Sequence, residues 1–439
     1  MTRPADGLLS AYVGLTRLAA PLGRLVVALR RRRGKEHPER WAERLGDPGA
    51  DVESDTATVW IHAASVGETV AALPLVDRIA GTGVRVVLTT VTTTSAAVAA
   101  SRLPAGVVHR FVPLDVAPFM DRFLTTWKPG LAIFVESEVW PVAVARLAAA
   151  ETPLVVLNAR MSDRSFRGWS RFPRVAAAIF GRVGLCLAQS ADDADRFRAL
   201  GAPRVVDVGN IKFDAPVPEA EPEAAAALGA ALAGRPMFLA ASTHPGEEAF
   251  VFDAFGRLQA SVDRLALVIA PRHPDRGPEI AEMAAARGFT VERRGGGGLP
   301  SPVTDVYVAD TVGELGTLYR LADAAFVGGS LVPFGGHNPI EPVRLGAPVV
   351  SGPHVGSFRD AFAALQAAGG VAMVDDAAGL AAEVAALIGD PSARARLTTA
   401  AGEVVARYTG ALDRTFRMVE PLLAAMAVEA RLTPMEEDW

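Results

Sequence analysis

Residues 59–69 read "VWIHAASVGET", an apolar run followed by small residues and a single carboxylate. The nearly continuous apolar run is typical of a strand that is covered on both faces, as in a parallel sheet. The small residues then form a turn into the helical stretch "GETVAALPLVDRIAGTG". The sequence therefore predicts a strand–turn–helix unit with Glu68 at the carboxyl end of its strand.

The same unit recurs along the chain. In the first half the further candidate strands are "RVVLTTV", "LAIFVES", "PLVVLNA" and "LCLAQS". In the second half they are "MFLAAST", "LALVIAPRH", "FTVERR", "DVYVAD", "AAFVGGS" and "APVVSG". Strands that alternate with helices predict an α/β fold of two Rossmann-like lobes with doubly wound parallel sheets. Ligands of such sheets bind beyond the carboxyl ends of the strands, which predicts a cleft between the two lobes.

The domain boundaries follow from composition. A length of 439 residues favours two domains. The proline-rich and acidic stretch "GNIKFDAPVPEAEPEAAAALGA" is typical of a linker. We predict an N-terminal membrane-associated and basic segment (1–45), a first lobe (46–212), a linker (213–234), a second lobe (235–410) and a C-terminal helical segment (411–439).

The bulk composition excludes some function classes. A net charge of −5 argues against a general nucleic-acid binder, because no basic excess is available to neutralise phosphates. The single cysteine, Cys186, rules out an internal disulfide framework and favours a reducing compartment. No G-x-G-x-x-G follows the first strand and no G-K-[ST] is present, which disfavours a dinucleotide dehydrogenase and a P-loop NTPase.

The N-terminal segment has a membrane-associated character. Residues 7–29 are mostly apolar and "RRRRGK" follows them at once. A secretory signal has the opposite order, whereas this order suits a segment held at the cytoplasmic face. Arg17 would cost roughly 2.5–3.5 kcal/mol in a spanning helix. We therefore expect an interfacial anchor, with a docked amphipathic helix as the alternative, and a local basic surplus that suits an anionic lipid.

Polar residues gather at the strand ends of the second half. "GGSLVPFGGHNPIEP" brings glycines, His337 and a helix start with Asn338 as the expected N-cap, an arrangement that suits a nucleotide phosphate. Glu341 in the first helical turn suits sugar hydroxyls. "APRHPDR" supplies Arg272, which suits a phosphate leaving group, together with His273. "ASTHPGEE" adds Ser242 and Thr243, whose hydroxyls either bind phosphate or cap the next helix.

The strand ends of the first half carry acids and bases. Glu136 and Glu138 in "ESEVWP" would suit a carboxylate-pair hydrolase, although binding or structural roles are favoured. "NARMSDRSFRGWSR" carries Arg160 and Arg164, which suit a phosphorylated acceptor or a solvated helix face. Lys212 in "GNIKFD" lies near the lobe junction, where both hinge and phosphate roles are open. By itself Glu68 is either a first-turn helix residue or a general base.

Eight motifs in one order give a resemblance. "HAASVGE", "ESEVWP", "LNARMS", "GNIKFD", "ASTHPGEE", "PRHPDR", "DTVGEL" and "AFVGGSLVPFGGHNPIEP" strongly resemble the 3-deoxy-D-manno-octulosonic acid (Kdo) transferases of lipopolysaccharide synthesis. The resemblance covers nearly the whole chain. It implies a GT-B fold and an inverting, metal-free transfer from CMP-Kdo to the lipid A precursor (lipid IVA). The enzyme would lie at the cytoplasmic face of the inner membrane.

The resemblance also implies residue roles. Glu68 would be the general base for the acceptor hydroxyl. The donor-binding residues that we predict, from the motifs and the resemblance together, are Ser242, Thr243, Arg272, His273, Gly328, Gly329, Ser330, His337, Asn338 and Glu341. The predicted acceptor-binding residues are Ser65, Glu136, Arg160, Arg164 and Lys212. The predicted partners are CMP-Kdo, the anionic lipid A precursor and the membrane surface, without nucleic acid, cofactor or metal.

Three alternatives remain at this point. A GT-B transferase that uses a UDP-linked donor differs only in its nucleotide. A hydrolase would depend on Glu136 and Glu138 and would tolerate the loss of Glu68. A non-enzymatic membrane scaffold is disfavoured by the dense polar residues at the strand ends.

Overall fold

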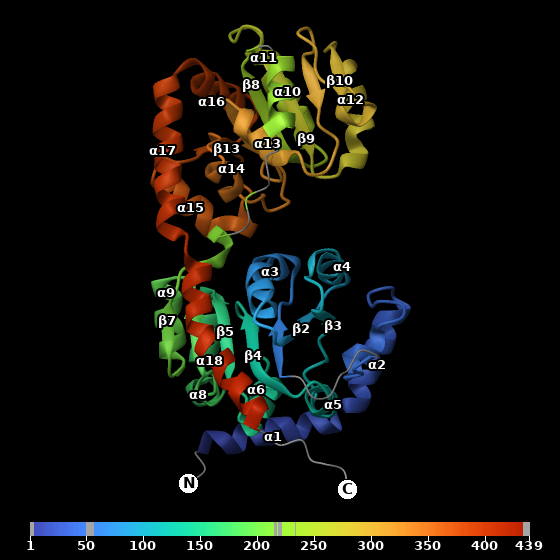
Figure 1. Cartoon of the computed structure of the whole chain (residues 1–439), viewed down its shortest axis with the longest axis vertical. Coiled ribbons are helices and arrows are strands. Elements are labelled where there is room, and N and C mark those ends of the chain that lie inside the picture. The colour runs from blue at the N-terminus through green and yellow to red at the C-terminus, as the bar shows by residue number, and fades with distance from the viewer. Residues whose placement is uncertain (1–3, 50–56, 215–216, 218–221, 233, 433–439) are drawn as a thin grey trace. The chain divides into compact units, whose positions relative to one another are not determined.

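The computed structural model describes residues 4–49, 57–214, 217, 222–232 and 234–432 (Figure 1). The chain divides into two compact units. Unit 1 comprises residues 1–215 and 409–439, and unit 2 comprises residues 216–408. Each unit has its own parallel sheet, which agrees with the predicted pair of Rossmann-like lobes.

Unit 1 contains a seven-stranded sheet in the order β3-β2-β1-β4-β5-β6-β7, and all its neighbouring strands are parallel. Its strands are β1 (Thr58–His62), β2 (Arg85–Thr90), β3 (Val108–Phe111), β4 (Pro129–Val135), β5 (Leu154–Ala159), β6 (Leu185–Ala188) and β7 (Val205–Asp207). The helices between them are α3 (Val66–Ala80), α4 (Thr93–Arg102), α5 (Ala117–Trp127), α6 (Pro141–Ala149), α7 (Asp163–Ser170), α8 (Pro173–Phe180) and α9 (Ala191–Ala199). Two apolar cores, each built on one set of strand side chains, show that the sheet is covered on both faces.

Unit 2 repeats this architecture with the order β10-β11-β9-β8-β12-β13-β14. Its strands are β8 (Met237–Thr243), β9 (Ala266–Pro271), β10 (Val291–Arg293), β11 (Val306–Val308), β12 (Ala324–Val327), β13 (Val349–Ser351) and β14 (Ala372–Met373). Its helices are α10 (Pro222–Leu232), α11 (Glu247–Leu258), α12 (Gly277–Ala285), α13 (Leu315–Leu321), α14 (Ile340–Arg344), α15 (Arg359–Ala367), α16 (Ala377–Gly389) and α17 (Pro391–Tyr408).

The predicted linker over 213–234 needs a correction, because much of it is helical. Helix α10 (Pro222–Leu232) belongs to unit 2 and packs against α13. Leu228 and Leu232 are buried in the core there. The alanine and leucine residues that follow the prolines favour a helix with one apolar stripe, and this propensity prevails over the linker composition.

After unit 2 the chain returns to unit 1 as α18 (Ala411–Leu432), which packs on α3 and β4. Asp214 anchors the return by accepting hydrogen bonds from the backbone N–H groups of Gly410 (2.7 Å) and Leu412 (2.6 Å). Further along, Val419 and Leu423 are buried in the core of unit 1. The C-terminal helix is therefore an integral part of the first lobe.

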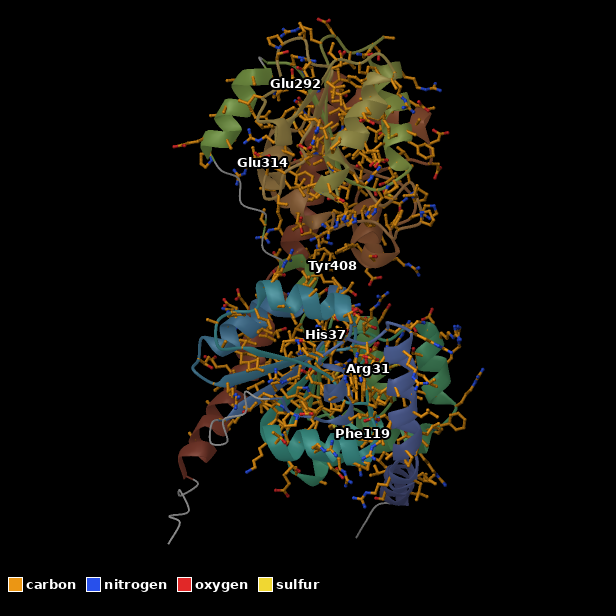
Figure 2. The ribbon with its side chains drawn as sticks, turned by 90° about the vertical axis from the view of Figure 1, so that its right-hand side faces the viewer. Arg31, His37, Phe119, Glu292, Glu314 and Tyr408 are labelled. Atoms are coloured by element: carbon orange, nitrogen blue, oxygen red, sulfur yellow. The ribbon has the colours of Figure 1, made fainter. Side chains whose placement is uncertain are left out.

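Helices α1 (Pro4–Leu18) and α2 (Ala20–Arg32) dock on unit 1 through one face only. Leu9 and Val13 are buried in its core, and Gly23 lies against Phe119, which Figure 2 labels. The opposite face carries exposed apolar side chains. They are Leu8, Tyr12, Leu15, Leu18, Leu22, Leu25, Val26 and Leu29, here called the apolar face.

No single helix in the described ranges is long and apolar enough to cross a bilayer. Gly7–Leu18 and Ala20–Arg32 reach the required length and apolarity only as a pair, and they are bent by 58° at the break between them.

Part of the basic surplus between Arg24 and Arg44 serves the fold. Arg44 is buried, donates to Glu36 (3.1 Å) and also reaches the backbone carbonyls of Val91 and Val112, beyond β2 and β3. Arg40 forms a bidentate pair with Glu43 at 2.8 and 2.9 Å. These contacts tie residues 36–45 to the sheet. The exposed cations left in this segment are Arg24, Arg31, Arg32, Arg33 and Lys35. The guanidinium of Arg31, a residue labelled in Figure 2, lies over the ring of Trp41.

Candidate active site

Both sheets have a topological switch point, where two neighbouring strands send their connections in opposite directions. In unit 1 it lies between β1 and β4, and in unit 2 between β8 and β12. Segments that follow such strands are the usual ligand-binding positions of open α/β sheets. The switch points bring together residues 63–68 with 136–138, and residues 242–247 with 328–331.

Glu68 occupies the first turn of α3, where Ser65 is the N-cap. Its Oε1 accepts from the Ser65 hydroxyl (2.8 Å) and its Oε2 from the backbone N–H of Ala64 (2.8 Å). In return, Ser65 Oγ accepts from the Glu68 N–H (3.3 Å), so the two side chains cap the helix reciprocally. These bonds fix the carboxylate beyond the carboxyl end of β1, and each of its oxygens keeps a lone pair for a further donor.

The surroundings of Glu68 make its carboxyl group more basic. Burial raises the pKa of Glu68 above its ordinary value, and the nearby charges of Glu136 and Glu138 raise it further. The hydrogen bonds from Ser65 and Ala64 oppose this rise. A carboxylate with a raised pKa is the form in which glutamate serves as a general base near neutral pH. The helix-capping and catalytic interpretations are therefore compatible.

Glu136 and Lys212 form an ion pair at the β4 end of the switch point. The distance between Lys212 Nζ and Glu136 Oε1 is 2.6 Å, and both side chains are largely buried. Glu136 has a φ of 60°, a left-handed conformation that is uncommon outside glycine and is often found at functional sites. Lys212 comes from the short helix η2 (Ile211–Asp214), which the β5 residue Asn158 holds by accepting from the N–H of Ile211 at 3.1 Å.

The other predicted acceptor-side residues are Arg160 and Arg164. Arg160 follows β5 and is partly buried, whereas Arg164 is exposed on α7. Helix α7 exposes Arg167 as well, while Trp169 packs edge-on against Phe180 at 5.3 Å. The structure thus joins Ser65, Glu136 and Lys212 to the Glu68 environment, and it places Arg164 on a solvated helix face.

In unit 2 the residue that organises the site is Glu247, which the sequence analysis did not assign. Its carboxylate is fully buried and accepts four backbone N–H bonds. The donors are His244 (3.0 Å), Gly329 (2.6 Å), Ser330 (2.9 Å) and Leu331 (2.9 Å). Glu247 therefore joins the segment after β8 to the segment after β12. The first glutamate of "HPGEE", directly after a strand-to-helix turn, was the available signal.

The backbone N–H groups of the glycine loop (328–330) are engaged within the protein. The N–H of Gly328 binds the carbonyl of Ala241 (2.8 Å), and those of Gly329 and Ser330 bind Glu247. Ser330 is fully buried, and its hydroxyl donates to Val327 O (2.6 Å) and accepts from the N–H of Gly352 (2.9 Å). A Cβ on Gly328 would lie 2.6 Å from the carbonyl oxygen of Ser242. Gly328 therefore permits a close approach of the protein's own backbone, and Gly329 one of the His337 ring, 3.2 Å from an added Cβ. Contact of these residues with the donor stays a prediction.

Thr243 and Arg276 belong to a second buried carboxylate. Glu248 is fully buried and accepts from the Thr243 hydroxyl (2.9 Å) and from Arg276 (2.6 Å). The Thr243 hydroxyl, predicted to bind the donor, thus has an internal acceptor. Next to it, Ser242 has a left-handed φ of 56° and is partly exposed.

Histidines and an arginine collect beside the glycine loop. His244 and His337 lie 2.9 Å apart between their Nε2 atoms, with ring planes only 9° from parallel. His273 approaches His244 edge-on at 6.1 Å, and Phe334 stacks on His244 at 4.2 Å. The pKa of His337 is lowered to about 4 by burial and by the charges of its neighbours, among them Arg272. The positive charge of this cluster comes from Arg272, which is exposed directly after β9 and suits an anionic ligand.

The helix start after the glycine loop differs by one residue from the prediction. Helix α14 (Ile340–Arg344) begins at Ile340, so Pro339 occupies the N-cap position in place of Asn338. Asn338 still organises the turn, because its Oδ1 accepts from the N–H of Ile340 (3.0 Å) and its Nδ2 donates to Glu341 (3.1 Å). Asn338 and Glu341 are therefore hydrogen-bonded to each other. Their roles in donor binding stay predictions.

Comparison with known proteins identifies the family. A family model described as 3-deoxy-D-manno-octulosonic-acid transferase (kdotransferase) matches residues 39–215. The chain is 33% identical to the 3-deoxy-D-manno-octulosonic acid transferase of Haemophilus influenzae, over 94% of this chain and 98% of that protein. The chain belongs to the Kdo transferase family. The corresponding enzyme of Bordetella pertussis is 36% identical over 94% of this chain and 99% of its own length.

The fold of this Kdo transferase also has solved counterparts. A glycosyltransferase from Rickettsia africae has a TM-score of 0.55 at 11% identity and covers 84% of this chain and 99% of its own. At such low identity the likeness concerns the fold alone. It agrees with the predicted GT-B architecture. The predicted family and transferase activity are confirmed separately, by the curated relatives.

Within the described ranges, no group of three or more His, Cys, Asp or Glu side chains is arranged to hold a metal ion. Metal-independent transfer stays a prediction.

Proposed function

We propose that this enzyme transfers Kdo from CMP-Kdo to the lipid A precursor (lipid IVA), with inversion at the anomeric carbon and with Glu68 as general base. The observation that carries the proposal is the Glu68 carboxylate, fixed at the β1 switch point by its helix cap and made more basic by burial. In the reaction Glu68 takes the proton of an acceptor hydroxyl. The hydroxyl oxygen bonds to the anomeric carbon, and the bond from that carbon to the CMP phosphate oxygen breaks.

Unit 2 supplies the groups for the leaving nucleotide. CMP leaves as a phosphate monoester, and an arginine can stabilise the negative charge that develops on its phosphate. Arg272 places a permanent positive charge near His337, at the strand ends of unit 2. We assign Arg272 to the phosphate and the linked pair Asn338–Glu341 to the ribose side. Lys212 and Glu136 in unit 1 would orient the acceptor.

Nucleotide choice gives the first prediction. We expect CMP to raise the melting temperature of the full-length protein, whereas UDP at the same concentration has little effect, because a ligand that binds only the folded state stabilises it by mass action. At a free concentration of about 100 times Kd the stabilisation would be about 2.7 kcal/mol. Differential scanning fluorimetry measures this, with Arg272→Met as the variant expected to lose the shift. Stabilisation by UDP alone would support the UDP-sugar alternative.

Membrane attachment is the second part of the proposal. We place the enzyme at the cytoplasmic face of the inner membrane, with the apolar face of α1 and α2 in the lipid interface. Leu15 is 64%, Leu18 79% and Leu22 61% exposed. The exposed cations that follow, Arg31, Arg32 and Arg33 among them, would contact anionic headgroups.

This attachment yields the second prediction. Leu18→Glu combined with Leu22→Glu should weaken binding to vesicles of phosphatidylglycerol and phosphatidylethanolamine at least tenfold. Each leucine that enters the interface contributes about 1.5–3 kcal/mol when fully buried, and each new carboxylate repels the anionic surface. Vesicle co-sedimentation measures the change. Val312→Glu, at an 88% exposed position of unit 2, is the matched control. Equal binding of the double variant and the control would contradict the assignment.

A further inference from the structure

The segment after β4 carries a second acid, Glu138, which has different neighbours from Glu136. Whereas Glu136 pairs with Lys212, the contacts described for Glu138 involve uncharged donors. Trp140 donates its indole Nε1–H to Glu138 Oε2 at 2.7 Å. The Nε2 atom of His62 lies 3.9 Å from the same oxygen. The side chain of Glu138 is 29% exposed.

His62, the last residue of β1, is fully buried and rigidly held. Its Nδ1 lies 2.9 Å from the hydroxyl of Thr89 and 3.2 Å from the Thr89 carbonyl oxygen. The rings of Phe134 and Trp140 pack edge-on against it, at 5.6 and 5.2 Å. Within the described part of the chain, its Nε2 has no hydrogen-bond partner. A buried polar atom that lacks a partner requires an explanation, and here it faces a carboxylate.

The protonation state of His62 limits the possible arrangements. Burial lowers the pKa of His62 to about 3, so the imidazole is neutral at physiological pH. A neutral ring carries one proton. In the tautomer in which Nδ1 accepts from the Thr89 hydroxyl, the proton sits on Nε2, which lies 3.9 Å from Glu138 Oε2. The Trp140 indole binds Oε2 of Glu138, and the His62 imidazole lies beside the same oxygen. The other oxygen, Oε1, is left for a ligand.

We infer that Glu138 binds a hydroxyl group of the acceptor sugar through Oε1, and that His62 and Trp140 are positioning residues that orient this carboxylate through Oε2. The inference rests on the proposed function, because it assigns a second hydroxyl contact to the same acceptor. Carboxylates are good acceptors for sugar hydroxyls, since the bond is assisted by their charge. The charge of Glu138 also contributes to the raised pKa of Glu68, which places both acids at one end of the sheet.

Steady-state kinetics of the full-length enzyme test this role. Kdo transfer is measured by mass spectrometry, with the lipid acceptor varied at saturating CMP-Kdo and then the reverse. Glu138→Gln should raise the KM for the acceptor about tenfold to a hundredfold, the range that corresponds to loss of one hydrogen bond to a charged group. The KM for CMP-Kdo should stay within twofold of the wild type. An unchanged acceptor KM, or an equal rise for both substrates, would overturn the assignment.

The positioning residues are tested by matched variants. Trp140→Phe should raise the acceptor KM several-fold, whereas Trp127→Phe should not, because the Trp127 indole N–H is buried without a hydrogen-bond partner among the described residues. His62→Asn retains a polar group near the Nδ1 position and His62→Gln one near the Nε2 position. We expect the acceptor KM of His62→Gln to lie closer to the wild-type value than that of His62→Asn. A smaller change in His62→Asn would overturn the role of Nε2.

The outcomes also separate this inference from the proposed function. If the wild-type enzyme transfers no Kdo to the lipid acceptor, the proposed function fails. If the wild type is active and Glu138→Gln matches it in acceptor KM, only the role of Glu138 fails. Melting temperatures of all variants are recorded, and Glu138→Gln, at a partly exposed position, keeps the test valid even where a His62 variant does not fold.

Discussion

Replacing Glu68 with Gln should lower kcat by about a hundredfold to ten-thousandfold, the usual contribution of a general base. Glutamine retains the shape of the side chain and can still accept one of the two hydrogen bonds that Ala64 and Ser65 donate. Helix α3 should therefore remain capped, and the KM for CMP-Kdo should change little. The variant removes the proton acceptor and leaves the scaffold in place.

The pH profile gives the same test a second readout. The base must be deprotonated, so activity falls as the pH drops through its pKa. Because burial raises the pKa of Glu68, the acidic limb of kcat/KM should have its midpoint above the ordinary glutamate pKa of about 4.3. Glutamine cannot titrate, so this limb should vanish from the residual activity of Glu68→Gln.

Two comparison variants make the Glu68 result specific. Glu420→Gln, on the exposed side of α18, should behave as the wild type in both kcat and pH profile. Glu136→Gln and Glu138→Gln together test the hydrolase alternative, which predicts that turnover depends on this pair and persists without Glu68. Wild-type turnover in Glu68→Gln would exclude the proposed general base.

Much of the fold was predictable from the strands, because a parallel strand that is buried on both faces has a nearly continuous apolar sequence. The strands that the sequence analysis did not identify are short or lie at a sheet edge. They are β3 ("VHRF"), β7 ("VVD") and β14 ("AM"). In β3 the polar His109 and Arg110 are buried by Arg40 and by backbone carbonyl partners, which no local pattern reveals. Edge strands depend on such tertiary partners more than on their own composition.

The candidate site was predictable in position but less so in detail. Glu68, Arg272 and the Asn338–Glu341 pair follow strands, so chain order alone places them at the ligand-binding edges. The sequence could not show whether a polar residue faces a ligand or another residue. Thr243 was expected either to bind phosphate or to cap a helix, and Ser330 to belong to the donor-binding loop, and the hydroxyls of both are satisfied by protein groups. Such assignments depend on contacts between distant segments, as the link from Glu247 to the glycine loop shows.

Glu247 underlies the second prediction with a large effect. Replacing Glu247 with Gln should destabilise unit 2 by about 3–5 kcal/mol and abolish stabilisation by CMP, because a buried carboxylate that holds several donors is exchanged for a neutral amide. The wild-type oxygens accept N–H bonds from His244, Gly329, Ser330 and Leu331. Glutamine offers only one oxygen, and its NH₂ group would face backbone donors. Urea unfolding and CMP thermal shifts measure the two effects.

We attribute the effect of Glu247→Gln to the loss of backbone hydrogen bonds in the glycine loop, and not to the loss of one negative charge. The control must therefore remove the same charge from an exposed glutamate. Glu292→Gln, at an exposed position of β10 that Figure 2 labels, makes the same chemical change at the surface of the same unit. We expect it to leave both the unfolding midpoint and the CMP shift unchanged. If Glu247→Gln unfolded at the wild-type urea concentration, the four N–H groups would not depend on this carboxylate. Loss of the CMP shift with unchanged stability would instead mean that Glu247 acts on the nucleotide directly, since a loop that lost its anchor would weaken the lobe as well.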